Sequence, residues 1–155
     1  MSKPSLEAAI PPGAALLIDT SVALAYLTGT ERSSSAAERL FDAFVATGRN
    51  AAALSMVTVS EILVRPFRAG PSAVATAEGF LRHFAEIRLI EATYEVAREA
   101  ARIRAATGLR MPDALVIASA VVSAADIVVT NDRAWAAAAA TATPRLSVCR
   151  LDIYP

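Results

Sequence analysis

The stretch Leu16-Leu17-Ile18-Asp19-Thr20-Ser21 decides the fold. Its first half continues an apolar run that begins at Ala14, after Pro11-Pro12-Gly13, and such a run is typical of a strand buried on both faces in a parallel sheet. Asp19 then falls at the carboxyl end of the strand, where α/β folds bind their ligands. The simpler interpretation is that its carboxylate caps the helix expected over residues 22–27, a role that Thr20 or Ser21 could also fill.

Length and composition predict a single domain with a core of small aliphatic side chains. The chain has 155 residues, of which 55% are hydrophobic and 6% aromatic, and this is enough to bury one sizeable core. We expect residues 1–13 to form a poorly ordered N-terminal arm and residues 14–155 to form the domain. The formal net charge is zero, so a polyanionic partner would have to be held by a local patch of positive charge.

Cysteine content and the N-terminal sequence both favour an intracellular location. Cys149 is the only cysteine, which allows no internal disulfide and fits the reducing cytoplasm. Glu7, Pro11 and Pro12 interrupt any signal-like apolar segment, and Asp19 follows too soon for a helix that spans a membrane. We therefore predict a soluble cytoplasmic protein without a membrane segment.

Two nearly absent residue types exclude several kinds of chemistry. Lys3 is the only lysine and His83 the only histidine. The chain has no G-x-x-x-x-G-K-[ST] motif and therefore no P-loop, and haloacid-dehalogenase phosphatases and receiver domains are disfavoured because both need a lysine late in the chain. His83 lies between Arg82 and Phe84 in an expected helix and is interpreted as a surface residue. Carboxylates and a metal ion would therefore have to carry any catalysis.

Strand-like and helix-like segments alternate along the rest of the chain. Apolar runs predict further strands at 51–54, 87–90 and 127–130, with a last edge strand at 145–148. Helical patterns fall between them, at 36–47, from residue 61 to Pro66 or Gly70, from 71 to 84, at 93–106 and at 112–125. This alternation predicts the α/β class, with a central parallel sheet of four to five strands flanked by helices on both faces.

Four acidic residues fall where such a sheet would gather them. Asp19 and Asp132 follow apolar strands, Asp113 opens an apolar helix, and Glu61 lies one helical turn past the second strand. Right-handed crossovers bring the carboxyl ends of the strands to one edge, so the four can share a pocket. Four carboxylates stay ionised in a small site only with cations, and ligation by oxygen alone points to Mg²⁺ or Mn²⁺. The alternative is that each acid caps its own helix separately.

The segments around these acids resemble the motifs of one nuclease family. They read Leu-Ile-Asp-Thr-Ser at 17–21, Val-Ser-Glu-Ile at 59–62, Pro-Asp-Ala-Leu-Val-Ile-Ala at 112–118 and Val-Thr-Asn-Asp at 129–132. In this order, over roughly residues 14–150, they look like the motifs of PIN-domain nucleases. The compact size without an appended domain is similar to the VapC-type toxins of bacterial toxin–antitoxin pairs. Met111 and Pro112 precede the third acid, at a place where the family varies.

The resemblance implies a single PIN-like domain that acts as a metal-dependent endoribonuclease, a hydrolase of RNA phosphodiester bonds. Asp19, Glu61, Asp113 and Asp132 would bind Mg²⁺ or Mn²⁺ and form the catalytic site. Asp19 would be the central ligand, Glu61 and Asp113 would hold or position the catalytic metal, and Asp132 would support a weaker second site. The supporting residues, which would orient ligands or waters, are Thr20, Thr130 and Asn131.

Three arginines are candidates for contacts with RNA phosphates. Arg65 lies one helical turn after Glu61 on the same helix face. Arg110 lies three residues before Asp113, and Arg133 directly follows Asp132. Each of the three could equally be a surface arginine or pair with the neighbouring acid.

The resemblance also implies two protein partners, a cognate antitoxin and a second copy of the chain. For the homodimer, the helix at 36–47 and the segment 74–84 could leave an exposed apolar patch, unless loops cover it or both simply pack on the sheet. The residues of this expected patch are Leu40, Phe41, Phe44 and Val45, with Val74, Phe80, Leu81 and Phe84.

Two other functions are compatible with the same acids. One is a metal-dependent phosphoesterase or DNA nuclease that uses the same site. The other is a PIN-like binding module that is catalytically silent, although the intact set of acids argues against it.

Overall fold

The computed structural model of the chain describes residues 4–84 and 86–154. Its strands and main helices follow the order expected from the alternating sequence pattern, α4 begins five residues before the predicted helix, and α1 and η2 were not predicted. They are α1 (Leu6–Ala9), β1 (Leu16–Ile18), α2 (Thr20–Thr28), α3 (Ser34–Glu38), the π-helical segment η1 (Arg39–Val45), β2 (Ala52–Ser55), α4 (Met56–Ala69), α5 (Pro71–His83), β3 (Arg88–Ile90), α6 (Tyr94–Thr107), α7 (Met111–Val122), β4 (Ile127–Thr130), α8 (Trp135–Ala142), β5 (Ser147–Arg150) and the 3₁₀ turn η2 (Leu151–Ile153).

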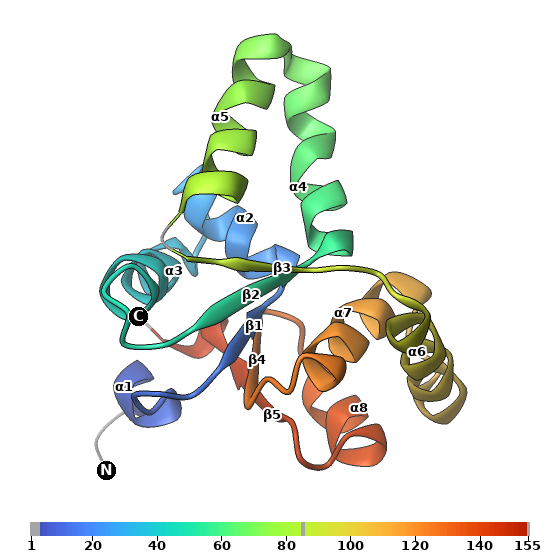
Figure 1. Cartoon of the computed structure of the whole chain (residues 1–155). Coiled ribbons are helices and arrows are strands. Elements are labelled where there is room, and N and C mark those ends of the chain that lie inside the picture. Colours follow the sequence, from blue (N-terminus) through green and yellow to red (C-terminus); the bar gives the residue numbers. More distant parts are fainter. Residues whose placement is uncertain (1–3, 85, 155) are drawn as a thin grey trace.

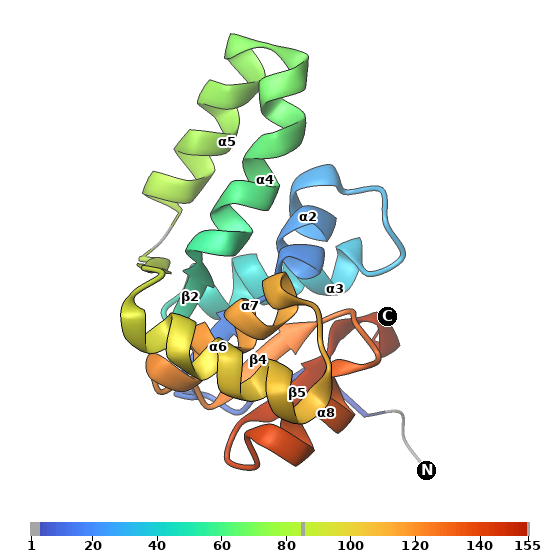
Figure 2. The same ribbon diagram turned by 90° about the vertical axis from the view of Figure 1, so that its right-hand side faces the viewer.

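The sheet has five strands in the order β3-β2-β1-β4-β5, and every neighbouring pair is parallel. β1 lies in the centre, where Leu16 pairs with Ala52 of β2 on one side and with Ile127 of β4 on the other. Helices cover both faces of the sheet (Figure 1 and Figure 2). The predicted α/β fold with a central parallel sheet and helices on both faces is therefore confirmed.

Alternation along the strands divides the core into two layers. Successive side chains of a strand point to opposite faces, so Leu16 and Ile18 pack into one cluster while Leu17 packs into the other. The first cluster joins the sheet to α1, α2, α3, η1, α4 and α5. The second joins it to α6, α7 and α8, and it holds Trp135, which is fully buried as a packing residue. β1 and β4 are buried at every position, as expected for central parallel strands.

The apolar patch predicted for dimerisation does not lie on the surface. Leu40, Phe41, Phe44 and Val45 are all buried in the first core cluster, where the ring of Phe41 stacks on Tyr26 with centroids 4.5 Å apart. Three of the four patch residues in 74–84 also pack on that cluster: Leu81 is buried in it, and Phe80 and Phe84 are partly buried against it, whereas Val74 is half-buried outside it. This part of the prediction is wrong because most of these side chains pack on one face of the sheet and form its hydrophobic core.

The N-terminal segment differs from the arm expected over residues 1–13. Of these, 1–3 lie outside the described residues. Residues 6–9 form α1, and Leu6 and the C-cap residue Ile10 are buried in the first core cluster. Asn50 holds the chain that follows, because its side-chain amide donates to the carbonyl oxygens of Pro11 and Ala14, each at 2.9 Å. Leu6 and Ile10 therefore pack this segment against the core, while Pro4, Ser5 and residues 11–13 are exposed.

α4 and α5 form an antiparallel hairpin that projects from the sheet (Figure 1). The sequence left the end of α4 open between Pro66 and Gly70, and the helix continues through Pro66 to Ala69. α5 then begins at Pro71, where a proline is tolerated because the first turn of a helix leaves its amides unpaired. Within the described residues, the helices fall short of the length and apolar character needed to cross a membrane.

Replacing Asn50 by alanine tests whether this side chain fixes the segment before β1. We expect Asn50→Ala to lower the free energy of unfolding by about 1–3 kcal/mol, because the buried Asn50 side chain makes two hydrogen bonds to backbone carbonyls and both are lost. Urea denaturation measures the change, and Thr47→Ala, which removes an exposed hydroxyl bonded to the Ala43 carbonyl of the same region, is the control. Equal stability of the two variants would contradict the anchoring role.

Candidate functional site

Topology brings all four predicted acids to the carboxyl edge of the sheet. Asp19 directly follows β1, and Asp132 lies two residues past β4. α4, which carries Glu61, starts directly after β2, and Asp113 lies in the first turn of α7, the helix that leads back to the amino end of β4. Sharing an edge does not by itself make a site, so the contacts of each acid decide which of them act together.

Asp19 is buried, and three donors satisfy most of its carboxylate. Its Oδ1 accepts the backbone N–H of Thr20 at 2.7 Å. Its Oδ2 accepts the hydroxyls of Ser21 and Thr130, each at 2.8 Å. Asp19 is the N-cap of α2, so the simpler interpretation of this residue is correct for Oδ1. The hydroxyl of Thr130 arrives from β4, and this second contact has nothing to do with capping.

Among residues 4–84 and 86–154, the hydrogen bonds to Asp19 leave one acceptor position of its carboxylate unused. A carboxylate offers about four lone-pair sites, and the three hydrogen bonds leave one of them on Oδ1. Burial raises the pKa of the Asp19 carboxyl, the hydrogen bonds from Ser21, Thr130 and the Thr20 amide lower it, and the negative charge of Glu61 raises it further, with a net increase. The ionised form is therefore less favourable here than in water, and a cation at the free position would stabilise it.

Glu61 reaches Asp19 through Thr20. The hydroxyl of Thr20 donates to Oε2 of Glu61, while the backbone N–H of the same residue donates to Asp19. The hydroxyl of Thr58 lies 3.0 Å from that of Thr20 and is fully buried. Thr20, the predicted supporting residue, thus links the two carboxylates that the structure brings together.

The loop after β4 is also tied to Asp19. The hydroxyl of Ser21 accepts the backbone N–H of Asn131, and that of Thr130 accepts the backbone N–H of Asp132, both at 3.0 Å. Each of these hydroxyls donates its own hydrogen to Asp19. The side chain of Asn131 extends the network by donating to Ser33 at 2.9 Å. Two parallel relays therefore fix the position from which Asp132 and Asn131 approach the site.

Asp113 and Asp132 do not join Asp19 and Glu61 in one cluster. Asp113 accepts from Arg110 Nε at 3.1 Å, and Asp132 accepts the backbone N–H of Ala134 at 2.8 Å. Across residues 4–84 and 86–154, no three acidic, histidine or cysteine side chains lie close enough to hold one metal ion. The sequence predicted one four-acid pocket, and the structure has a coupled pair, Asp19 and Glu61, with the other two acids on the same edge.

The predicted phosphate-binding arginines have different surroundings. Arg110 pairs with Asp113, as the alternative interpretation allowed, although most of its own side chain is exposed. Arg65 and Arg133 are exposed. The pKa of Asp152 is lowered chiefly by its hydrogen bond with Arg150, and Arg133 adds a smaller effect of the same sign.

Three hydroxyl residues of the site were not among the predicted site residues. Ser21 and Thr58 had a signal that sequence reasoning could have used: Ser21 follows Asp19 by two residues, and Thr58 precedes Glu61 by three on the same helix face. Ser33 precedes α3 and had no such signal, because only the folded chain brings it to Asn131.

The donor set fits a hard divalent cation. Asp19 and Glu61 offer carboxylate oxygen, the described part of the site contributes neither imidazole nor thiolate, and Asp19 and Glu61 form no ion pair with a described Lys, Arg or His. Oxygen-only ligation suits Mg²⁺ or Mn²⁺. Asp19 and Glu61 are the two described acids of the site that could hold such an ion together.

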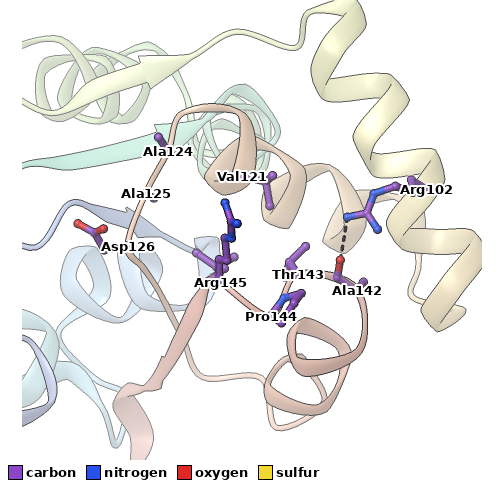
Figure 3. Close-up of a pocket in the computed structure, with 10 residues that line it drawn as sticks. Arg102, Val121, Ala124, Ala125, Asp126, Ala142, Thr143, Pro144 and Arg145 are labelled. Carbon is purple, nitrogen blue, oxygen red and sulfur yellow. Dashed lines mark hydrogen bonds between the residues drawn. The ribbon is translucent and has the colours of Figure 1, made fainter.

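A hollow of about 540 Å³ lies at the opposite edge of the sheet, where Asp126 precedes β4 (Figure 3). Figure 3 shows Arg102 donating to the carbonyl oxygen of Ala142, and this arginine also pairs with Glu99. Asp126 accepts the backbone N–H of Ala15 at 2.8 Å. Arg102 and Asp126 are thus engaged in holding elements together, and the hollow does not include any of the predicted site residues.

Comparison with known proteins identifies one sequence family. The family described as PIN domain matches residues 16–140, most of the chain. No curated protein matches the chain by sequence.

The fold is similar to those of solved toxin–antitoxin proteins. A chain of a toxin–antitoxin complex from Klebsiella pneumoniae is 20% identical, with a TM-score of 0.63 over 84% of this chain and 94% of that one. VapC20 of Mycobacterium tuberculosis, described as a sarcin–ricin loop cleaving toxin, is 17% identical, with a TM-score of 0.59 over 73% and 86%. A chain of VapBC-5 from the same organism is 24% identical, with a TM-score of 0.59 over 88% and 98%. At these identities the likeness establishes the fold alone.

Substituting Asp19 tests its unfavourable burial in the metal-free protein. A carboxyl whose pKa is raised by folding stabilises the protein below its unfolded pKa, near 4, and this contribution is lost as the pH rises through the folded pKa. Asparagine does not titrate. We therefore expect the melting temperature of Asp19→Asn minus that of the wild type to increase between about pH 4 and pH 7.

Thermal unfolding in excess chelator measures this difference, and Asp42→Asn is the matched control. Asp42 is an exposed carboxylate that also accepts a hydrogen bond, from Tyr26 at 2.9 Å. A difference for Asp19→Asn that stays constant with pH would show that burial of Asp19 carries no such cost.

Proposed function

Because the chain belongs to the PIN domain family, we propose that it is a Mg²⁺- or Mn²⁺-dependent endoribonuclease, the toxin of a toxin–antitoxin pair. One observation carries the proposal: a buried carboxylate, Asp19, retains a free lone-pair site beside a second carboxylate, Glu61, at the ligand-binding edge of a parallel sheet. The description of the solved neighbour VapC20 as a sarcin–ricin loop cleaving toxin supports RNA as the substrate class.

We assign Asp19, Glu61, Asp113 and Asp132 as the metal-binding acids. Asp19 and Glu61 form the inner pair, since Thr20 contacts both. Asp113 and Asp132 flank them from α7 and from the loop after β4. When bound, a divalent ion supplies positive charge that lowers the pKa of water and stabilises negative charge on a leaving oxygen.

The protein groups around the acids contribute orientation. Ser21 and Thr130 hold the carboxylate plane of Asp19, so its free lone pair keeps one direction. The same hydroxyls fix the backbone of Asn131 and Asp132. Such preorganisation lowers the cost of placing water and phosphate in line for attack.

Arg110 is the arginine best suited to bind an RNA phosphate near the acids. Its Nε donates to Asp113, and its side chain is largely exposed. A guanidinium has five N–H donors, so the groups not used by Asp113 can bind a phosphate while the pair stays intact. Arg65 and Arg133, which are exposed, would contribute to a longer and weaker path for the strand.

We propose two protein partners on separate surfaces. A cognate antitoxin would cover the acids and offer a Lys or Arg in place of the metal charge, and the toxin–antitoxin complexes among similar folds support such a partner. The homodimer would instead form through Phe67 and Val64 of α4, which are exposed, because most of the apolar patch predicted from the sequence packs in the core. Phe67 lines an apolar hollow together with Pro71 and Val74 at the tip of the hairpin.

Cleavage assays with matched substrates test the proposed activity. We expect single-stranded RNA to be cut in the presence of Mg²⁺ or Mn²⁺, and excess EDTA to abolish the reaction reversibly, because the acids need a cation to act together. Asp19→Asn should reduce the cleavage rate at least a hundredfold even with metal, while Asp42→Asn should leave it unchanged.

Each other result points to a different function. Undiminished RNA cleavage in EDTA would overturn the metal-dependent mechanism. Cleavage of DNA or of a generic phosphate ester in preference to RNA would favour the alternative phosphoesterase or DNA nuclease. A protein that binds no metal and cuts none of these substrates would be a silent binding module.

Light scattering tests the homodimer. At micromolar concentration we expect the mass of two chains, and we expect Phe67→Ser to shift the protein toward the monomer, since an exposed phenylalanine loses its apolar contact. Tyr94→Ser on α6, which replaces an equally exposed aromatic residue, is the control and should leave the dimer intact. A fully active monomeric wild type would refute the dimer.

A further inference from the structure

We infer that Thr58 is a positioning residue for Glu61, acting through Thr20. Thr58 lies in the first turn of α4, is fully buried, and has its hydroxyl 3.0 Å from the hydroxyl of Thr20. Thr20 in turn contacts Oε2 of Glu61. The importance of this role for metal binding rests on the proposed function. The contacts between Thr58, Thr20 and Glu61 do not depend on that proposal.

Counting hydrogens gives the direction of this chain of hydroxyls. An ionised carboxylate only accepts, and each threonine hydroxyl has one hydrogen to donate. The hydrogen of Thr20 goes to Glu61, because the carboxylate has no hydrogen to give and the contact is a hydrogen bond only if Thr20 donates. The hydrogen of Thr58 then goes to Thr20, its hydrogen-bond partner within the described residues. The order is therefore Thr58 to Thr20 to Glu61.

With this direction, Thr58 affects the hydrogen bond between Thr20 and Glu61 in addition to packing in the core. A hydroxyl that accepts a hydrogen bond becomes a stronger donor, so Thr58 strengthens the bond from Thr20 to Glu61. It also keeps the hydrogen of Thr20 directed at Glu61. When Thr58 donates to the oxygen of Thr20, the hydrogen of Thr20 cannot point back toward Thr58.

The effect falls on a side chain that is otherwise poorly held. Glu61 is an exposed residue on a helix, and its hydrogen bond with Thr20 is the contact that orients its carboxylate among the described residues. Thr20 also donates its backbone N–H to Asp19. Thr58 thus sets how the Glu61 carboxylate stands relative to Asp19, although it touches neither acid.

The test compares Thr58→Val with Thr58→Ser. Valine has nearly the shape of threonine and lacks the hydroxyl, whereas serine restores it. Thr143→Val is the matched control, because Thr143 is also a buried threonine, bonded to the carbonyl of Ala139, and lies at the opposite edge of the sheet (Figure 3).

The first readout needs neither metal nor RNA. In metal-free protein at pH 7, the carboxyl ¹³C resonance of Glu61 should shift in Thr58→Val, return toward the wild-type position in Thr58→Ser and stay unchanged in Thr143→Val. In a Thr20→Val background, Thr58→Val should cause no further shift, because the link through Thr20 is already gone.

The second readout is Mn²⁺ affinity, measured from the free-ion signal in electron paramagnetic resonance. We expect Thr58→Val to weaken Mn²⁺ binding about tenfold, in the range found when a residue behind a metal ligand is lost. An unchanged Glu61 resonance in folded Thr58→Val overturns the inference, whatever the enzyme does. A shifted resonance in a protein that neither binds Mn²⁺ nor cuts RNA supports the positioning role and overturns only the proposed function.

Discussion

The burial of one carboxylate constrains the whole carboxyl edge of the sheet. Asp19 ends the central strand, and a buried charge is tolerated only where donors replace the lost water. The donors come from the start of α2 and from the end of β4, so the two segments must lie at hydrogen-bond distance. The loop of Asn131 and Asp132 is then placed by the same hydroxyls. The site and the local fold are therefore consequences of a single requirement.

Capping and ligand binding are compatible roles for Asp19. Its Oδ1 caps α2 through the amide of Thr20, and the same oxygen keeps a free lone pair. The helix amino terminus brings partial positive charge to the carboxylate, which tempers the cost of burial without neutralising it. A residue placed in this way adds to the stability of a helix and still presents a charge that is incompletely compensated.

The sequence predicted the frame of the molecule better than the details of its site. Unbroken apolar runs such as 14–18 and 127–130 identify central strands, because burial on both faces leaves little room for polar residues. Asp19 and Asp132 could be placed at the carboxyl edge of the sheet because each follows one of these strands. The role of Ser33 could not be predicted, because it depends on the path of a loop, and the sequence left the pairing of Arg110 with Asp113 as one of two alternatives, because the choice depends on side-chain rotamers. α1 escaped prediction because one turn with two buried residues, Leu6 and Ile10, is too short for periodicity to detect.

The separation of Asp19 and Thr130 along the chain has a consequence for biosynthesis. The two residues are 111 positions apart, and β4 pairs with both β1 and β5. A ribosome that adds roughly 5–20 residues per second needs several seconds to make the intervening chain. The chain from Asp19 to Thr130 must therefore have left the ribosome before this contact can form, and the β-α units made first cannot assemble the site by themselves. The ribonuclease proposed above would in this way lack its assembled site while that segment is being made.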